Sequence, residues 1–254
     1  MEGRYKKVLS NSGQKILATL KVRKKLSIIE PICAHWQLKE NGLKNLKQNK
    51  INKKFIYLIS PNKIKHNKFY QDLEQVLNLK KVRFFQLRLK NEINKNKIFI
   101  GKKIKKICQK NKVKFIINDD PYLAKKLNAD GCHLGQKDMD FLSSRNILSK
   151  KKIIGITCHN SKKLALSAKK LGANYIAFGA FYKSSTKKTI YKANLPLLRW
   201  ARKKINMPIV AIGGINNSNY KKILLNGANF VACSNYVWNN KKLDPVSAIK
   251  KFKY

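Results

Sequence analysis

Short apolar runs recur along the chain from residue 55 onward, and each is followed by a polar turn and then by an amphipathic stretch. The runs are rich in Ile, Val, Phe and Tyr, as buried strands of parallel sheets tend to be. We therefore predict eight strands. They occupy residues 55–60, 83–89, 114–119, 131–135, 153–158, 175–179, 208–214 and 230–235.

The stretches between these runs have the spacing and the end signals of helices. Ser161 and Asp120-Pro121 are favoured N-terminal residues, and Gly172 is a favoured stop. A strand–helix alternation repeated eight times predicts a parallel (β/α)8 TIM barrel, of class α/β. An open, doubly wound sheet is the alternative fold.

Residues 1–54 lie outside this alternation. We predict a basic N-terminal extension over 1–54, which carries no chemistry-bearing motif and has no assigned role, and a barrel domain over 55–254. The chain has no apolar run of the ~20 residues needed to span a bilayer, and none of signal-peptide length near its N-terminus. We expect a cytoplasmic protein without a membrane partner.

The charge is strongly basic, with 57 Lys and Arg against 12 Asp and Glu. A basic surface attracts nucleic acids, but here the excess is spread over the whole chain, and a global Lys and Asn bias explains it. We therefore expect no specific nucleic-acid partner. The five cysteines are scattered, which argues against a disulfide framework. The sequence is compatible with a homo-oligomer but does not fix the oligomeric state.

The scarce acidic residues cluster in one stretch, because residues 118–140 hold five of the 12 carboxylates. Asp119 follows the third predicted strand, and Asp138 lies in the loop after the fourth. Parallel barrels place their active sites at the carboxyl ends of the strands. Mg²⁺ prefers a few carboxylates together with water and phosphate oxygens. Asp119 and Asp138 therefore predict a Mg²⁺ site.

Other strand ends carry groups suited to phosphate. Arg88 can hold phosphate oxygens with two parallel hydrogen bonds, and Lys90 and Lys187 add point charges. The glycine pair 213–214 follows the seventh strand, where backbone approaches a phosphate closely and barrels often bind one. We expect a diphosphate near strands 2–5 and a monophosphate near strands 6–8.

Six segments, in order and in spacing, resemble the motifs of the thiamine-phosphate synthase family, with QLRLK and STKK most similar to an alphaproteobacterial branch. They are QLRLK (86–90), NDD (118–120), GCHLGQKDM (131–139), GITCHN (155–160), FGAFYKSSTKK (178–188) and VAIGGI (210–215). This resemblance implies a transferase that joins 4-amino-2-methyl-5-hydroxymethylpyrimidine diphosphate to thiazole phosphate and releases diphosphate. Its partners would be these two small-molecule substrates.

The resemblance also implies roles for single residues. Catalysis would rest on Arg88, Lys90 and Lys187, and Mg²⁺ on Asp119 and Asp138. The pyrimidine diphosphate would contact Gln86, Arg88, Lys90 and Asn118. Thr157, where the family often has Ser, and Lys187 would contact the diphosphate. The thiazole phosphate would contact Ser184, Thr186, Gly214, Ser234 and Asn235.

Some features depart from the family pattern or have simpler explanations. Leu89 stands where the family usually has Glu, Lys183 where Pro is common, and Asn235 where Ser is usual. Asp120 and Asp140 are better explained as helix caps than as ligands. Two alternatives to the synthase stay open: a thiazole tautomerase or other paralogue on the same barrel, and an RNA-associated protein. Asp138 favours the synthase, because tautomerase-like relatives tend to lack it.

Overall fold

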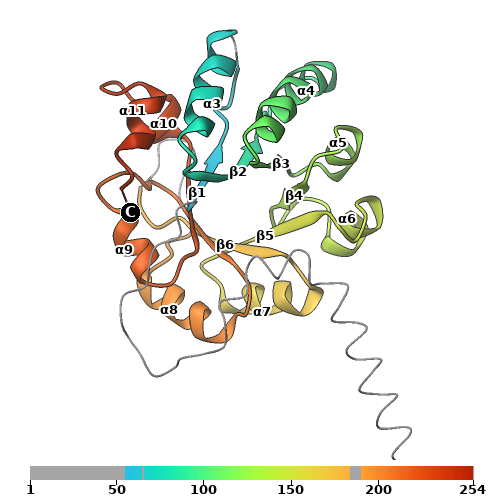
Figure 1. Cartoon of the computed structure of the whole chain (residues 1–254). Helices are drawn as coiled ribbons and strands as arrows, with labels where there is room; N and C mark the ends of the chain where they lie inside the picture. The colour runs from blue at the N-terminus through green and yellow to red at the C-terminus, as the bar shows by residue number, and fades with distance from the viewer. Residues whose placement is uncertain (1–54, 65, 184–189, 254) are drawn as a thin grey trace, which may run out of the picture. The chain divides into compact units, whose positions relative to one another are not determined.

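Eight parallel strands close into a barrel in the computed structural model, which describes residues 55–64, 66–183 and 190–253. The first six strands are labelled in their order around the ring in Figure 1. The full order follows the sequence, and β1 pairs with β8. This closed ring confirms the predicted TIM barrel and excludes the open sheet. The strands are β1 Ile56–Ile59, β2 Val82–Leu87, β3 Lys114–Asn118, β4 Gly131–Leu134, β5 Ile153–His159, β6 Tyr175–Gly179, β7 Ile209–Ile212 and β8 Phe230–Cys233.

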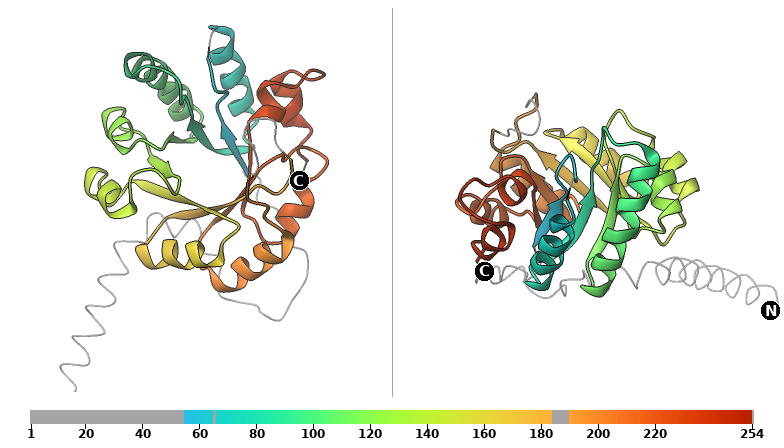
Figure 2. Two further views of the ribbon diagram at one scale, coloured as in Figure 1. Left: turned by 180° about the vertical axis from the view of Figure 1, so that it is seen from behind. Right: turned by 90° about the horizontal axis from the view of Figure 1, so that it is seen from above.

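Helices cover the outside of this barrel, as the two views of Figure 2 show. The sequence predicts helices over residues 68–79, 97–110, 121–128, 161–172 and 216–227, and these five are confirmed as α3, α4, α5, α7 and α9. The cap predicted at Asp140 marked the start of α6, while α8, α10 and α11 were not predicted individually. Their bounds are α3 Lys68–Asn78, α4 Asn94–Lys110, α5 Pro121–Lys126, α6 Phe141–Ile147, α7 Lys162–Leu171, α8 Leu195–Lys204, α9 Tyr220–Leu225, α10 Asn235–Trp238 and α11 Pro245–Lys250.

The predicted helix caps are confirmed. The Asp120 carboxylate accepts from the Leu123 N–H at 2.8 Å, and Asp140 accepts from the Ser143 N–H at 3.0 Å. Ser161 caps α7 in the same way, and Gly172 ends that helix with φ +82°. Asp120 and Asp140 therefore serve the helices that follow the strand ends, which separates them from the candidate metal ligands.

Aromatic side chains fill the part of the barrel interior that lies away from the carboxyl ends of the strands. Tyr57 of β1 stacks on Phe84 of β2 with ring centroids 5.3 Å apart, and Phe84 meets Phe230 of β8 edge-on at 5.2 Å. The Tyr57 hydroxyl lies 2.8 Å from the hydroxyl of Tyr175 in β6. Because β1 and β6 are not neighbouring strands, this hydrogen bond crosses the interior. The interior is therefore packed, and the space for chemistry lies above it, at the strand ends.

The seam between β1 and β8 is tied by side chains as well as by the strand ladder. The Trp238 indole N–H donates to the Ile59 carbonyl at 2.7 Å, and the Ser234 hydroxyl donates to the Ser60 carbonyl at 3.0 Å. These bonds join the segment after β8 to the end of β1. The last strand thus closes the ring and also fixes the first strand's carboxyl end.

The predicted extension over residues 1–54 lies outside the described residues, so its role stays a prediction. Within the described part of the chain, none of the helices has the length and apolar character needed to cross a bilayer.

Candidate active site at the carboxyl ends of the strands

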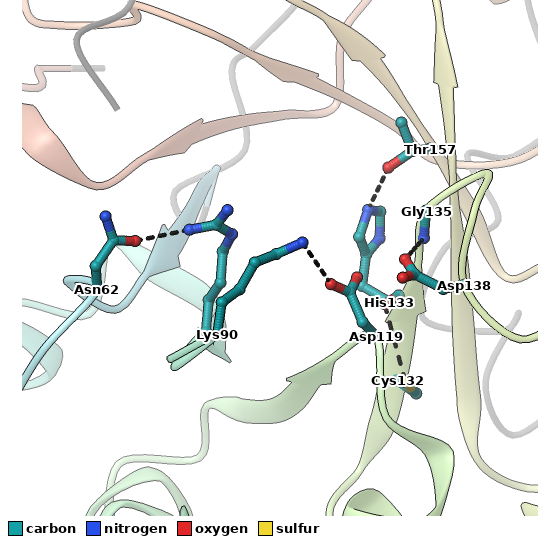
Figure 3. A network of polar contacts seen from close by, with 9 residues as sticks. Asn62, Lys90, Asp119, Cys132, His133, Gly135, Asp138 and Thr157 are labelled. Carbon is teal, nitrogen blue, oxygen red and sulfur yellow. Dashed lines mark hydrogen bonds and ion pairs between the residues drawn. The ribbon is translucent and has the colours of Figure 1, made fainter. Parts of the chain in front are cut away.

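The two predicted metal ligands lie side by side at the ends of β3 and β4 (Figure 3). Asp119 follows β3 directly and has φ +64°, a left-handed conformation that Asp tolerates better than most residues. Its N–H donates to the His133 carbonyl at 2.8 Å, which fixes it against β4. In the next loop, the Gly135 N–H donates to the Asp138 carboxylate at 2.8 Å. These two hydrogen bonds from backbone N–H groups thus hold Asp119 and Asp138 with their carboxylates next to each other.

The proximity of the two carboxylates changes how readily each loses its proton. Burial and the neighbouring Asp119 carboxylate raise the pKa of Asp138. Burial would also raise the pKa of Asp119, but hydrogen bonds with Asp138 and Lys90 outweigh it, so the pKa of Asp119 is lowered. Two adjacent carboxylates repel unless a positive charge lies with them. This pair therefore has the electrostatics of a cation site.

Two cationic side chains follow the end of β2, and Lys90 is the one that reaches the acidic pair. The Lys90 ammonium lies 3.0 Å from the Asp119 carboxylate. The Arg88 guanidinium donates to the Asn62 side chain at 2.7 Å, and the Arg88 backbone N–H donates to the Ser60 hydroxyl at 2.9 Å. The loop after β1 therefore orients the guanidinium. Lys90 and Arg88 give the β2 end the charge needed to bind phosphate oxygens.

The predicted pyrimidine contacts belong to the same region. Gln86 is 2% exposed, and in the described part of the chain its side-chain NH₂ group has no hydrogen-bond partner. Buried polar groups are seldom left unpaired, so such a group points to a ligand. Asn118 ends β3 and lines a pocket of about 360 Å³ together with Lys90 and Asp119. The structure thus places Lys90, Asn118 and Asp119 around one pocket, whose lining does not include Gln86, Arg88 or Asp138.

Thr157 near the end of β5 is held from two sides. Its hydroxyl lies 2.8 Å from Nε2 of His133, and its carbonyl accepts from the Gln136 side chain at 2.5 Å. His133 itself points into the barrel and also contacts the Tyr175 hydroxyl at 2.9 Å, so both ring nitrogens are satisfied. Burial lowers the pKa of His133 to about 4. The histidine is therefore a neutral residue of the barrel interior, whereas the sequence had left open whether it faces the interior or the helix layer.

The opposite part of the barrel mouth is built from small residues. Gly213 and Gly214 follow β7 with φ +104° and +61°, a region that favours glycine. A Cβ at Gly214 would lie 2.4 Å from the Lys183 carbonyl oxygen, so nothing larger fits there. Ser234 and Asn235 follow β8 at the start of the short helix α10. Ser184, Thr186 and Lys187, predicted on the loop after β6, lie outside the described residues.

The donor set fits Mg²⁺ without forming a complete protein cage. Within the described ranges there is no cluster of three or more His, Cys, Asp or Glu able to hold a metal ion. Two carboxylates with substrate oxygens and water are what Mg²⁺ ordinarily uses, whereas Zn²⁺ sites need three or four protein ligands. Asp119 and Asp138 are therefore suited to Mg²⁺ brought together with a phosphorylated substrate.

Sequence reasoning missed Asn62, although the signal that found the other residues was present. Asn62 follows the first strand in the segment Ser60-Pro61-Asn62, so it is also a polar residue at a strand end. Its contact with Arg88 could not be foreseen, because the two residues are distant in sequence and meet only when β1 pairs with β2.

A closed parallel barrel with a carboxylate pair, cationic side chains and a glycine turn at one end is typical of enzymes that act on phosphorylated small molecules. Comparison with known proteins narrows this class. A family model described as thiamine monophosphate synthase matches residues 56–237.

A thiamine-phosphate synthase of Pelagibacter ubique is 66% identical over 208 residues, which cover 82% of this chain and 100% of the relative. Another from Erythrobacter litoralis is 39% identical over 197 residues, covering 76% of this chain and 92% of the relative. Among solved structures, a thiamine phosphate pyrophosphorylase from Pyrococcus furiosus has a TM-score of 0.70 at 27% identity, covering 80% and 96% of the two chains. The chain therefore belongs to the thiamine-phosphate synthase family, and its activity is that of a transferase in thiamine biosynthesis.

Proposed function

We propose that the barrel mouth joins 4-amino-2-methyl-5-hydroxymethylpyrimidine diphosphate to thiazole phosphate, with Mg²⁺ held by Asp119 and Asp138. Support comes from the paired carboxylates beside Lys90 and from the relatives named thiamine-phosphate synthase. The same names favour the synthase over the tautomerase alternative. A cytoplasmic location and the lack of a specific nucleic-acid partner stay predictions from the sequence.

The reaction begins when the C–O bond between the pyrimidine methylene and the diphosphate breaks. The bonding electrons leave with the diphosphate, and the electron-rich aminopyrimidine ring delocalises the positive charge that develops on the methylene. Arg88, Lys90 and Lys187 are assigned to the leaving diphosphate, where they stabilise the growing negative charge. The thiazole nitrogen then attacks the methylene and forms the new C–N bond. No proton has to be removed, so the scheme requires no general base.

A bound Mg²⁺ would supply further charge neutralisation on the diphosphate. Asp119 and Asp138 would hold it, and the Gly135 N–H would keep the Asp138 carboxylate in place. The pyrimidine would lie near Gln86 and Asn118, since the side-chain NH₂ group of Gln86 is buried and can donate to a ring nitrogen. Thr157 would contact the diphosphate with its hydroxyl.

The thiazole phosphate would occupy the other part of the mouth. Gly214 can bring its backbone N–H close to a phosphate because it has no side chain. Asn235, at the start of α10, would add a polar side chain from the end of β8, and Ser234 beside it would contribute its backbone, because its hydroxyl hydrogen is donated to the Ser60 carbonyl. Ser184 and Thr186 complete the proposed contacts from the loop after β6.

The observation that carries this proposal is the Asp119–Asp138 pair facing Lys90. The test is incubation of the protein with both substrates and Mg²⁺, followed by chromatographic detection of thiamine phosphate and of diphosphate. We expect both products in equal amounts, and none after chelation with EDTA. Diphosphate without thiamine phosphate would contradict the coupling step. Full activity in EDTA would contradict the metal site.

A further inference from the structure

A chain of hydrogen bonds runs through the barrel interior to the proposed diphosphate site. The Tyr57 hydroxyl lies 2.8 Å from that of Tyr175, which lies 2.9 Å from Nδ1 of His133. Nε2 of His133 lies 2.8 Å from the Thr157 hydroxyl. The two tyrosines are each 2% exposed. The hydrogen-bond chain therefore links buried Tyr57 to Thr157 at the barrel mouth.

The strand register explains why this chain can form. His133, Gly155 and Tyr175 lie at the same level on β4, β5 and β6. A Cβ at Gly155 would lie 1.9 Å from Cζ of the Tyr175 ring, so a glycine is needed between the two rings. With it, the imidazole and phenol rings stack at 5.5 Å with an interplanar angle of 12°. Gly155 thus creates the space through which His133 and Tyr175 make contact.

Which group donates in each hydrogen bond follows from the buried end of the hydrogen-bond chain, at Tyr57. Among the described residues, Tyr175 is the only hydrogen-bond partner of the Tyr57 hydroxyl. A buried hydroxyl hydrogen needs an acceptor, so Tyr57 must donate to Tyr175. The Tyr175 hydrogen then points to Nδ1 of His133, which must be unprotonated to accept it. The ring hydrogen therefore lies on Nε2 and is donated to the Thr157 oxygen.

The other protonation states of His133 would leave the Tyr57 hydroxyl hydrogen without an acceptor. A hydrogen on Nδ1, in the neutral or the charged ring, would have to be donated to Tyr175. Tyr175 would then donate to Tyr57, whose own hydrogen would have no acceptor in the described structure. Only the neutral ring with its hydrogen on Nε2 satisfies all the donors.

We propose that Tyr175 is a positioning residue that fixes the tautomer of His133, and that His133 thereby turns the Thr157 hydroxyl hydrogen toward the substrate's diphosphate. Because the Thr157 oxygen accepts from His133, its own hydrogen is available for a ligand. A phosphate oxygen only accepts hydrogen bonds, so it needs Thr157 as a donor. The Gln136 bond to the Thr157 carbonyl holds the backbone of this residue in place. The inference about the ligand rests on the proposed function, whereas the inference about the tautomer does not.

The tautomer can be measured without substrate by ¹⁵N NMR of protein labelled at histidine. The chain has four histidines, and His133→Gln identifies the signals of His133 by their loss. An unprotonated ring nitrogen resonates far downfield of a protonated one, and scalar couplings to the ring protons assign Nδ1 and Nε2. We expect a downfield Nδ1 and an upfield Nε2 throughout the neutral pH range. The reverse pattern, or two upfield nitrogens, would overturn the proposal.

Two matched tyrosine variants test the direction of the chain. Tyr175→Phe removes the donor to Nδ1, so the two ring nitrogens should move toward averaged shifts as the tautomers mix. Tyr57→Phe also removes one buried hydroxyl, but Tyr175 can still donate to Nδ1, so the ¹⁵N pattern should be unchanged. A loss of the pattern in Tyr57→Phe together with its retention in Tyr175→Phe would overturn the inferred direction.

Kinetics test the consequence for the substrate. The isosteric Thr157→Val should lower kcat/KM for the pyrimidine diphosphate by about tenfold or more relative to Thr157→Ser, which keeps the hydroxyl, as expected for a lost hydrogen bond to a charged group. Unchanged kcat/KM in Thr157→Val would overturn the role given to the hydroxyl. A native protein without synthase activity would refute the proposed function instead, and the NMR pattern would still decide the tautomer.

Discussion

The two parts of the barrel mouth hold polar groups in different ways. The ends of β2 to β4 present charged side chains, with Lys90 in an ion pair with Asp119 and Asp138 beside it. The ends of β7 and β8 present Gly213, Gly214 and other small residues, whose main contribution is backbone. The first part therefore binds through charge and the second through shape.

This difference predicts different sensitivities. Charge acts over several ångströms and depends on the protonation state, so the β2–β4 part should respond to removal of a carboxylate and to pH. A backbone site depends on close approach, so the β7–β8 part should respond to a single added methyl group. The two parts can thus be disabled separately by different kinds of substitution.

The largest effect is expected for Asp138→Ala. Loss of one of two carboxylates should abolish Mg²⁺ binding together with substrate, and turnover should fall by about a hundredfold or more, since metal catalysis contributes several kcal/mol. Steady-state kinetics at several Mg²⁺ concentrations measure the loss, and circular dichroism checks that the fold is intact.

Asp140→Ala is the matched control, because Asp140 lies two residues away and caps α6. It should retain kcat and the Mg²⁺ dependence while lowering the melting temperature. Equal kinetic losses in Asp138→Ala and Asp140→Ala would show that the loop needs its overall negative charge and not a specific ligand pair.

The free energy of unfolding should depend on pH because His133, buried in the barrel interior, has a lowered pKa. Burial lowers the pKa of His133 from 6.5 to about 4. Between these values the unfolded chain binds a proton that the folded chain does not. The stabilisation is therefore fully present above pH 6.5 and is lost as the pH falls toward 4, by roughly 3 kcal/mol. Urea unfolding of the native protein and of His133→Gln should give different slopes against pH, and parallel slopes would contradict this account.

Gly214→Ala should affect the shape-dependent part. The added Cβ would lie 2.4 Å from the Lys183 carbonyl oxygen, and φ is +61°. Moving the turn away from the phosphate should raise KM for thiazole phosphate by about tenfold, with a smaller effect on KM for the pyrimidine diphosphate.

Gly172→Ala provides the comparison for that variant. It shares the left-handed conformation, with φ +82°, but a Cβ there would have nothing within 4 Å. It should cost about 1 kcal/mol of stability and leave both KM values unchanged. If both glycine variants raised KM equally, backbone strain and not the phosphate site would be responsible.

The smallest effect is expected for Asp120→Ala, which removes the cap of α5. Stability should fall by about 1 kcal/mol, as for other N-caps, because the Leu123 N–H loses its acceptor. Activity should persist at close to the native level. A loss of turnover comparable to that of Asp138→Ala would place Asp120 in the metal site and would contradict the division of acids into ligands and caps.

The fold could be predicted from the sequence because each strand is a short apolar run bounded by polar turns. For example, 175–179 was predicted as a strand and is one. The strand-end rule placed Asp119 and Asp138 correctly near each other, since it depends only on parallel strands having their carboxyl ends at one side. The predicted cap at Asp140 indicated where α6 begins, but the extent of this helix was not predicted, because its seven residues, FLSSRNI, are too short and too polar for a clear period.

Contacts between side chains distant in sequence could not be predicted. The bond between Arg88 and Asn62 depends on the pairing of β1 with β2, and the chain from Tyr57 to Thr157 depends on the register of four strands. His133 could have been assigned to the interior or to the helix layer. Only the glycine at 155 decides the question, because its missing side chain gives the His133 and Tyr175 rings room inside the barrel.

The pairing of β1 with β8 also has a consequence for synthesis of the chain on the ribosome. β1 emerges early, but its partner β8 emerges last among the strands, after a delay on the order of ten seconds or more at ordinary translation rates. During this time one edge of the nascent sheet has unpaired backbone groups, which can pair with another chain. The Trp238 and Ser234 bonds form only when β8 has arrived, so they lock the ring at the moment when the exposed edge disappears. When several ribosomes translate one message, pairing between neighbouring nascent chains is therefore expected to be most frequent just before β8 is synthesised.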